Sequence, residues 1–559
     1  MNSQYDDFPQ NANTKIKWSR QDMSRNVVDF LSRKQEISQR EFAKATGIPR
    51  TTLQHWVQRL DKLDEDPALV AFFESPAGAD FLHLLIHALH LEFTKIGCGS
   101  IHNICNFLKM CKLSKFVAAS YGTHQKISSR MDAMLGEFGD MEQARLSKLM
   151  PEKKITLCED ETFHPQVCLV GIEPVSNFIL LERYADDRSA NTWNQAVAEG
   201  LANLPVKVLQ CTGDEAKGLI SHAIKGLNVH HSPDLFHVQY EIGKGTSVAL
   251  AGAVRTAEKN LEKCSNATRE ALERREKYES LVKRPVGRRP DFEQKIILAE
   301  EQEERAEAAL EKAKSNQENV VEARREISKM YHPYDPFTGE KRDHSTVSRN
   351  LEATFGKIRE AADSLPERCK KRVDKAWRVT EKMTATIAFF FCTIKSIVEE
   401  MELPDHKKRL MHTHLIPGFY LQRVADREKD PAVKKAIQQK ADELLYVLYD
   451  RDGPLAGCGD SEIDRMKRKA GECAGLFQRS SSCVEGRNAQ LSLRHQGMHR
   501  LSDQKLKALT VVHNYHLKRP DGTTAAERFY ENKPIDMFEW LLGNMASPPR
   551  PRRKIKLAA

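Results

Sequence analysis

Three features are missing from the sequence, and each absence narrows the class of protein. The 12 cysteines form no C-x-x-C pair and have no regular spacing, which favours a reducing compartment over a disulfide scaffold. The amino-terminal residues are polar and include no apolar stretch of the kind that a signal peptide contains. The most apolar run, residues 383–398, is too short to cross a bilayer and contains Lys395, so it predicts a buried helix. We therefore expect a cytoplasmic protein with no membrane partner.

The length and the charge of the chain point to a large protein with an anionic partner. A chain of 559 residues exceeds the size at which a single hydrophobic core stops growing, so several domains are expected. The 87 Lys and Arg residues outnumber the 78 Asp and Glu residues, and the net charge of +9 suits a polyanion. Residues 548–556, PPRPRRKIK, are almost purely basic. Such a tail is typical of an arm that contacts phosphates, and equally of a segment that only improves solubility.

A helix, a tight turn and a second helix are predicted near the amino terminus. Ser38 and Glu41 have the spacing of a capping box, and Gly47 marks the turn before a second helix that begins near Pro49. The polar face of this second helix contains Arg50, Thr51, Gln54, His55 and Gln58. Because Arg and Gln side chains make paired hydrogen bonds with base edges, this face has the chemistry of a DNA recognition helix. An ordinary helical hairpin with a solvated face is the alternative.

The residues that follow predict further helices. One helix is expected over residues 80–96. Residues 100–131 show a weaker pattern of helix, turn and helix, which fits a second DNA reader in series and equally a helical spacer.

From residue 154 onward the pattern changes to that of an α/β unit. Short apolar runs separated by turn residues predict strands, and an amphipathic stretch between the third and fourth runs predicts a helix. The strands are expected at residues 155–163, 167–172, 178–181 and 206–211, and the helix at residues 189–204. Asp160 lies late in the first strand, and Asp214 directly follows the fourth. Carboxylates at the ends of neighbouring strands converge, so we expect an α/β core with an acidic pocket.

Converging carboxylates predict a site for divalent cations. In two-metal phosphoryl transfer, acidic side chains hold ions that act on the attacking and the leaving oxygen. Carboxylates that leave room for water ligands suit Mg²⁺, with Mn²⁺ as the alternative. A single Asp at a strand end is more often a turn cap or a surface charge, so only the combination indicates a site. Glu159 and Glu161 flank Asp160, but side chains alternate along a strand, and we favour Asp160.

A third acidic residue is expected on a later helix. Residues 480–482 are serines that can cap a helix carrying Glu485. Residues 480–529, which begin SSSCVEGRNAQLSLRHQG, resemble the carboxy-terminal part of the DDE transposases that bacterial insertion sequences encode. This resemblance implies an RNase H-like core in which Asp160, Asp214 and Glu485 are the catalytic, metal-binding carboxylates.

Further site residues follow from the resemblance and from charge. The segment HHSPDLFH, residues 230–237, resembles an Asp-x-x-His signature of several transposase groups, which makes Asp234 and His237 secondary candidates. With the two preceding histidines they form a cluster, but no cysteine pair or fourth ligand supports zinc, and a helix cap with a hydrogen-bonded histidine is expected. Three arginines are candidates for holding the phosphates of a DNA end, or for a solvated basic face. They are Arg479, Arg487 and Arg494.

The long stretch between Asp214 and Glu485 predicts an inserted, all-helical domain. Residues 249–283 and 291–330 are charge-rich helical stretches separated by RPVGRRP, which is typical of an antiparallel hairpin. Such a hairpin serves dimerisation, grips DNA near its basic tip or braces the core. Trp377, in the later helices, is a stacking surface for a flipped base or, more commonly for a tryptophan, part of a core.

The predicted fold is multidomain, α and α/β, with an RNase H-like core interrupted by a helical insertion. The domains are a helix-turn-helix domain at residues 1–62, a helical region at 63–150, the first part of the core at 151–245, the insertion at 246–470, the last part of the core at 471–546 and the basic tail at 547–559.

The expected function is DNA transposition. A homodimer would bind the terminal inverted repeats of a mobile element, cleave double-stranded DNA with the help of Mg²⁺ or Mn²⁺, and join the ends to target DNA. It would act in the bacterial cytoplasm, associated with the nucleoid when bound to DNA. The alternatives are a catalytically inactive, transposase-derived DNA-binding regulator and an RNase H-like nuclease that does not join ends.

Overall fold

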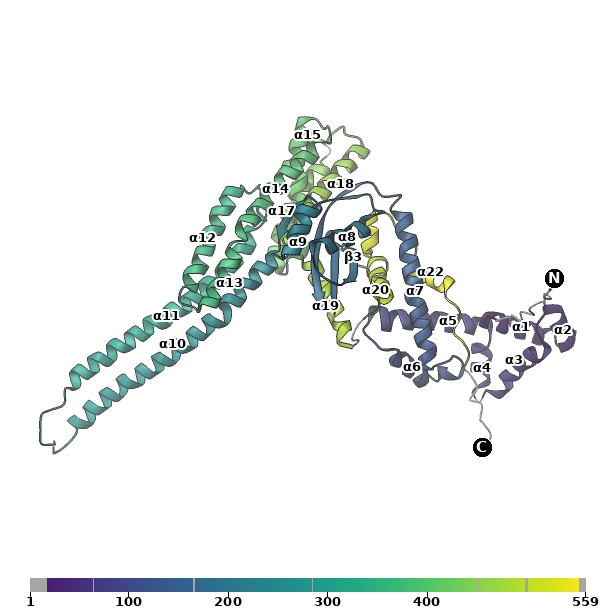
Figure 1. Ribbon diagram of the computed structural model, residues 1–559, viewed down its shortest axis with the longest axis horizontal. Helices are drawn as coiled ribbons and strands as arrows, with labels where there is room; N and C mark the ends of the chain where they lie inside the picture. Colours follow the sequence, from purple (N-terminus) through teal and green to yellow (C-terminus); the bar gives the residue numbers. More distant parts are fainter. Residues whose placement is uncertain are drawn as a thin grey trace, which may run out of the picture. The chain divides into compact units, whose positions relative to one another are not determined.

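The computed structural model describes residues 18–63, 65–163, 166–283, 285–450, 452–497 and 501–551. The chain divides into two compact units, which are described separately: residues 1–150 with 490–559, and residues 151–489. The described chain is mostly helical and contains a five-stranded sheet with both parallel and antiparallel pairs (Figure 1). The expectation of a multidomain protein with α and α/β parts is confirmed at this level.

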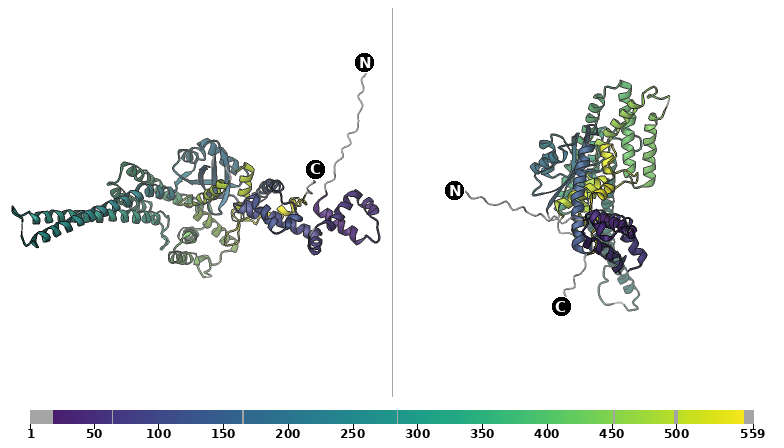
Figure 2. Two further views of the ribbon diagram at one scale, coloured as in Figure 1. Left: turned by 90° about the horizontal axis from the view of Figure 1, so that it is seen from below. Right: turned by 90° about the vertical axis from the view of Figure 1, so that its right-hand side faces the viewer.

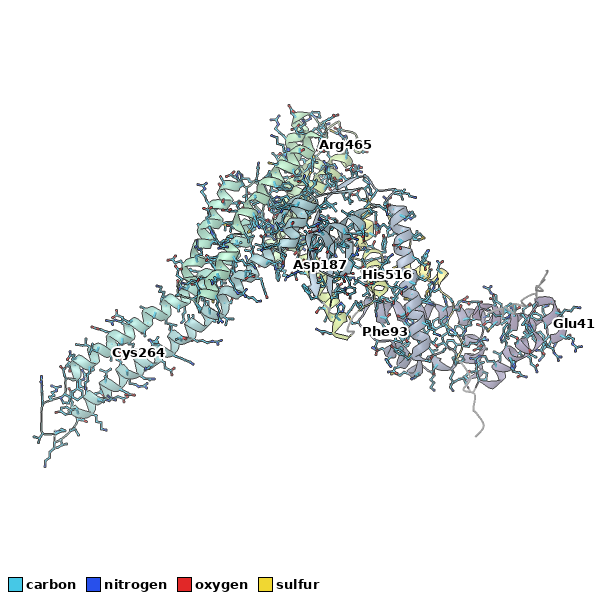
Figure 3. All side chains as sticks on the ribbon, viewed as in Figure 1. Glu41, Phe93, Asp187, Cys264, Arg465 and His516 are labelled. Carbon is cyan, nitrogen blue, oxygen red and sulfur yellow. The ribbon has the colours of Figure 1, made fainter. Side chains whose placement is uncertain are left out.

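The first unit begins with three short helices, α1 (Arg20–Ser32), α2 (Gln39–Thr46) and α3 (Arg50–Lys62). The Ser38 side chain accepts from the backbone of Glu41, whose carboxylate accepts in return, so the predicted capping box is present; Glu41 is labelled in Figure 3. Gly47 ends α2 with a φ of 68°, a conformation that glycine adopts without strain. Phe30, Phe42, Ile48 and Leu53 form a small core beneath these helices. Residues 1–17 of the predicted helix-turn-helix domain lie outside the described residues.

The other helices described in the first unit include a long one, α7. They are α4 (Pro67–Phe73), α5 (Pro76–His90), which continues as the π-helix η1 (Leu91–Ile96), α6 (Ile101–Met110), α7 (Tyr121–Leu146), α20 (Asp503–Tyr515), α21 (Ala525–Tyr530) and α22 (Met537–Asn544), with a 3₁₀ turn η2 (Leu113–Lys115). The helix predicted over residues 80–96 begins earlier, because Ser75 caps it and Pro76 fits the first turn. Helix α20 packs along α7, where Gly139 leaves room for Val511. Residues 490–546, predicted as the last part of the α/β core, therefore belong largely to this helical unit.

The basic tail enters the described structure only as far as Pro551. Arg550 pairs with the buried Glu74 at 2.6 Å, and the Ala118 amide donates to the carbonyl of Pro549. The start of the predicted tail is thus held within the first unit rather than presented as an arm. Residues 552–559 lie outside the described residues.

Buried histidines in the first unit predict a loss of stability in acid. Burial lowers the pKa of His87 to about 4 and that of His90 to about 3, and it also lowers the pKa of His124, whose Nδ1 lies 3.0 Å from His90 Nε2. Because the unfolded chain binds protons near pH 6.5, stability is fully present above that pH and falls towards pH 4. His87 and His90 each contribute about 1.4 kcal/mol per pH unit in this range.

Urea unfolding at pH 7.5 and at pH 5 measures this effect directly. The wild type is expected to lose about 2 kcal/mol more stability than His90→Gln, because the variant lacks one of the titrating groups. An equal loss of stability in both proteins would contradict the assignment.

The second unit is built on a mixed sheet. Its strands are β1 (Lys153–Phe163), β2 (Val167–Glu173), β3 (Phe178–Ala185), β4 (Val206–Gly213) and β5 (His230–Pro233). The strand order is β3-β2-β1-β4-β5, with β1 antiparallel to β2 and parallel to β4, and β4 parallel to β5. The four predicted strands are present, although β3 extends four residues beyond its predicted end. The fifth strand was not predicted, because its sequence, HHSP, is short and polar.

The two faces of β1 contact different helices. Leu157 and its odd-numbered neighbours join the core around Trp193 of α8 (Ala190–Leu201). Thr156 donates to the carbonyl of Leu476 at the end of α18 (Asp460–Leu476), and Cys158 Sγ lies 3.9 Å from the carbonyl of Ser480. The even-numbered face of β1 is therefore covered by residues that come some 320 positions later in the chain.

The remaining helices of the second unit are arranged around a long hairpin and a large helical core (Figures 1 and 2). They are α9 (Lys217–Ser221) with the π-helix η3 (His222–Gly226), α10 (Leu235–Glu279), α11 (Phe292–Met330), α12 (His344–Ala362), α13 (Glu367–Trp377), α14 (Thr380–Glu399), α15 (Asp405–Leu410) with η4 (Met411–Leu415), α16 (Ile416–Arg427), α17 (Pro431–Leu445) with η5 (Tyr446–Leu448), and α19 (Ser482–Gly497), which continues into the first unit.

The predicted hairpin and the predicted buried helix are both present, but the hairpin begins earlier in the chain than expected. Helices α10 and α11 pack against each other as the predicted antiparallel hairpin, but α10 begins at Leu235, so the predicted domain boundary at residue 246 falls inside it. The apolar run lies in α14, and its buried side chains include Met383, Phe390 and Val398, which confirms a buried helix.

Among the described residues, no single helix has the length and apolar character needed to cross a membrane. One bent pair, α4 with α5 and η1, meets those criteria jointly.

Candidate metal centre

Asp160 lies near the end of β1, and Asp214 directly follows the end of the neighbouring parallel strand β4. The last pair of these two strands is Cys158 with Thr212, two residues before each aspartate. The charge of Asp214 acts on both Asp160 and Glu485. Asp214 follows the last residue of β4, and its Oδ1 accepts from the amide of Ala216 at 2.9 Å. The carboxyl ends of two central strands thus present two carboxylates together.

Helix α19 brings a third carboxylate to the same place. Glu485 lies in the first turn of α19, and one turn later the Asn488 side chain donates to Asp160 Oδ2 at 2.9 Å. Ligand atoms of Asp160, Glu485 and His237 all lie within 4.8 Å of one another. His237 Nε2 is 3.6 Å from Glu485 Oε1. The structure therefore brings together Asp160, Glu485 and one of the two secondary candidates, and Asp214 directly follows the adjoining strand β4.

Strand alternation separates Asp160 from its two acidic neighbours. Glu159 lies on the opposite face, where its Oε1 is 3.0 Å from Nε2 of the buried His222. Glu161 also lies on that side and accepts from Nε1 of Trp193 at 3.3 Å. Neither glutamate takes part in the cluster around Asp160, which agrees with the choice of Asp160 from the sequence.

Asp234 holds the first turn of α10 and the start of α19. Its Oδ1 accepts from the amide of Phe236 at 2.7 Å, as an N-cap does, and its Oδ2 accepts from the Ser481 hydroxyl at 2.5 Å. The predicted helix cap is present. His237 Nε2, by contrast, lies 3.9 Å from Asp234 Oδ2 and makes no hydrogen bond among the described residues. Asp234 is a positioning residue, whereas His237 offers a free ring nitrogen to the cluster.

Burial and mutual repulsion raise the pKa values of the carboxylates in the cluster. Burial raises the pKa of Asp160 to about 7, and the charges of Glu485 and Asp214 act in the same direction. Burial also raises the pKa of Glu485, which Asp234 and Asp214 raise further and His237 lowers. Carboxylates that repel each other in a half-buried site are stabilised by a divalent cation, because it removes both the repulsion and the bound proton. Two or three carboxylates and one imidazole fit Mg²⁺ or Mn²⁺.

A cavity of about 260 Å³ adjoins the cluster. Asp214, Asp234 and His237 line it, together with the cations Arg188 and Lys375. Lys375 pairs with Glu241 at 3.0 Å. The cluster is therefore accessible from a polar cavity that carries both signs of charge.

The three arginines predicted to hold DNA phosphates are engaged within the protein. Arg487 forms a two-pronged ion pair with Glu182, with both bonds at 2.6 Å and side chains 5% and 0% exposed. Arg479 donates to the carbonyl of Ser328 and contacts His332. Arg494, in the first unit, donates to the successive carbonyls of residues 94–97 at the end of η1. These bonds argue against the predicted role, because a guanidinium that caps a helix or pairs inside the core is not presented to a phosphate.

The residues predicted to read DNA lie on one side of α3. Arg50, Thr51, Gln54 and His55 are exposed and Gln58 is half-buried, whereas Leu53 is buried and Trp56 packs edge-on against Trp18 with ring centroids 6.0 Å apart. The polar face expected from the sequence is thus presented to solvent.

His230 and Trp377, which were also considered as site residues, both pack against neighbouring side chains. His230 bonds the Thr386 hydroxyl at 2.9 Å and stacks on Phe389, so it does not join His237 in a zinc site. Trp377 packs on Phe355 with ring centroids 5.5 Å apart, as expected of a core residue.

A second group of potential ligands was missed, because it comes from three separate elements. Glu159, Cys211 and His222 are all buried, with ligand atoms within 4.8 Å of one another. His222 lies between Glu159 and the side chain of Asn194, whose Oδ1 is 2.6 Å from Nδ1. Both ring nitrogens therefore have hydrogen-bond partners, and the group is accounted for as a buried polar network.

Comparison with known proteins adds one match. Residues 411–557, about a quarter of the chain, match a family described as a family of unknown function (DUF6399). The matched region includes Glu485 and Asn488 but neither Asp160 nor Asp214. The comparison with curated proteins finds no match.

Proposed function

We propose that the protein is a DDE-type transposase, which cleaves the ends of a mobile DNA element and joins them to target DNA. The observation that carries the proposal is the cluster of Asp160, Glu485 and His237, which come from distant parts of the chain. Asp214 directly follows the strand beside Asp160, and its charge acts on both carboxylates of the cluster. The carboxylates lie at a mixed sheet of order β3-β2-β1-β4-β5, which agrees with the α/β core that the resemblance implies.

Asp160, Asp214 and Glu485, with His237, are the residues that would hold Mg²⁺ or Mn²⁺. Bound divalent cations supply activation of the attacking oxygen and stabilisation of the leaving oxygen in such in-line phosphoryl transfers. Asn488 holds one oxygen of Asp160 and so fixes the orientation of this carboxylate. Asp234 joins the start of α10 to the start of α19 and keeps His237 and Glu485 at a constant separation. The cavity beside the cluster gives DNA phosphates a cationic neighbour in Lys375.

The remaining parts of the chain have proposed roles in DNA handling. We assign the reading of terminal inverted repeats to α1, α2 and α3, as a helix-turn-helix domain, and regard the helices from α10 to α18 as an insertion in the catalytic core. A homodimer is expected, because two ends must be held together for joining. Double-stranded DNA is the substrate in both steps.

Substitutions on the polar face of α3 are expected to reduce the selectivity of the protein for element ends. Arg50→Ala and Gln54→Ala are each expected to lower the preference for element ends over unrelated DNA by about fivefold to a hundredfold, since one paired base contact contributes about 1–3 kcal/mol. Competition binding with end-derived and unrelated duplexes measures this preference. Arg33→Ala is the matched control, because Arg33 is an exposed arginine of the same region outside α3. Unchanged selectivity in both α3 variants would place the reader elsewhere.

The proposal is tested with DNA that carries the sequences flanking the encoding gene. Purified full-length protein is incubated with labelled duplexes and a target plasmid, with Mg²⁺, with Mn²⁺ and with a chelator. Metal-dependent cleavage at element ends followed by joining to the target supports a transposase. Selective binding without cleavage would support the regulator, and cleavage without joining would support a nuclease; either result contradicts the proposal.

A further inference from the structure

An exposed stripe of aromatic and cationic side chains runs along α10 beside the candidate metal centre. Phe236, Tyr240 and Lys244 are spaced by four residues, so they lie on one face of the helix. Phe236 is 49% exposed and Tyr240 is 45% exposed. His237, whose ring nitrogen faces the carboxylates, follows Phe236 directly. The rings of Phe236 and His237 are in contact, with centroids 5.7 Å apart, so the stripe adjoins the candidate metal centre.

The opposite side of α10 is already used for packing. Val238 and Ile242 are buried in the large helical core, and Gln239 donates to the carbonyl of Arg324 on α11. Glu241 pairs with Arg372 and Lys375 on α13. The core therefore does not explain the exposed rings, and the stripe itself contains no carboxylate.

The ring geometry is suited to a flat partner. The rings of Phe236 and Tyr240 are nearly parallel, with an interplanar angle of 20° and centroids 6.3 Å apart. This separation is close to twice the stacking distance of about 3.4 Å between successive bases. Lys244 Nζ lies 4.5 Å from the centroid of the Tyr240 ring, so the stripe also carries a cation for a phosphate. Aromatic faces with a nearby cation hold unpaired nucleotides without regard to sequence.

We propose that Phe236, Tyr240 and Lys244 form a stacking platform that binds unpaired nucleotides at the DNA end undergoing cleavage. This inference rests on the proposed function, since it assigns a single-stranded part of the substrate to that same site. A second copy of the chain is a poorer occupant, because a stable protein interface buries about 800 Å² on each side. Two half-exposed rings and one lysine supply only a small part of such an area.

The test compares duplexes that differ only in their ends. Wild-type full-length protein, Phe236→Leu, Tyr240→Leu and the double variant are titrated, with chelator present, with a blunt duplex and with the same duplex bearing a three-nucleotide single-stranded extension that contains 2-aminopurine. Leucine keeps an apolar side chain of similar reach and removes the aromatic face. Tyr449→Leu is the matched control, because Tyr449 is also an exposed tyrosine with a lysine, Lys467, near its ring.

If these side chains form the platform, the leucine substitutions should weaken binding of the extended duplex and not of the blunt duplex. Each substitution is expected to weaken binding of the extended duplex about fivefold or more and to abolish the quenching of 2-aminopurine, with blunt-duplex affinity and thermal stability unchanged. Equal affinities in variants and wild type would overturn the platform while leaving metal-dependent cleavage intact. A shift in sedimentation of the leucine variants would instead identify a protein interface and overturn it as well. Failure of the wild type to bind any duplex contradicts the proposed function itself.

Discussion

Replacing any one of Asp160, Asp214 and Glu485 by its amide is expected to lower the rate of DNA cleavage by about a thousandfold or more. Metal ions in such sites contribute several kcal/mol of transition-state stabilisation, and each 1.36 kcal/mol corresponds to a factor of ten in rate. Asp160→Asn and Glu485→Gln keep the size of the side chain and remove the charge that a cation needs. Because neither residue lies on the polar face of α3, DNA binding is expected to persist.

Single-turnover cleavage of end-derived duplexes in Mg²⁺ measures the loss, and gel-shift titrations measure the binding. Glu161→Gln is the register control. Glu161 adjoins Asp160 in sequence but contacts Trp193 and Arg188, so its substitution is expected to change the rate far less. A variant that retains near-wild-type cleavage would remove that carboxylate from the site, and equal losses in Glu161→Gln would contradict the assigned strand register.

Breaking the Arg487–Glu182 pair is expected to destabilise the second unit by about 3–5 kcal/mol. Both side chains are buried, and removal of one partner leaves an uncompensated charge in the interior. The pair also ties α19 to β3 only two residues after Glu485. Arg487→Ala is therefore expected to reduce metal affinity as well as stability, whereas the double variant Arg487→Leu with Glu182→Leu is expected to recover much of the stability.

The matched control for this pair lies on the same strand. Arg183 forms an ion pair with Glu199, but the two side chains are 44% and 53% exposed, so Arg183→Ala is expected to change stability by no more than about 1 kcal/mol. Urea unfolding of the three variants gives the comparison. Similar effects of Arg487→Ala and Arg183→Ala would show that burial of the first pair has little energetic consequence.

Local patterns in the sequence were sufficient to predict several elements of the fold. The capping box and the left-handed Gly47 define α2, and the alternating apolar runs define β1, β2 and β4. The resemblance pointed to Asp160, strand alternation separated it from Glu159 and Glu161, and the hydrogen bonds of all three residues agree with that separation. These predictions depend on interactions within a few residues, which a sequence displays directly.

Features that depend on distant contacts were predicted poorly. The strand β5 is four polar residues, and its place in the sheet is set by pairing with β4 rather than by its own composition. Helix α10 begins at Leu235, directly after its cap Asp234, and Ser481, 247 positions later, donates to the same carboxylate. The arginines near Glu485 resembled a basic face, yet Arg487 and Arg494 find their partners more than 300 positions earlier in the chain. Charge in a sequence does not reveal whether the chain itself neutralises it.

Iron-dependent cleavage of the polypeptide tests most directly whether the three carboxylates form one cation site. Fe²⁺ replaces Mg²⁺ in carboxylate sites, and with ascorbate and peroxide it cuts the backbone close to its ligands. A single site formed by the three carboxylates predicts fragments that end near residues 160, 214 and 485, all suppressed by excess Mg²⁺ and by Asp160→Asn. Cuts at other positions, or the absence of any Mg²⁺-sensitive cut in these three places, would contradict it.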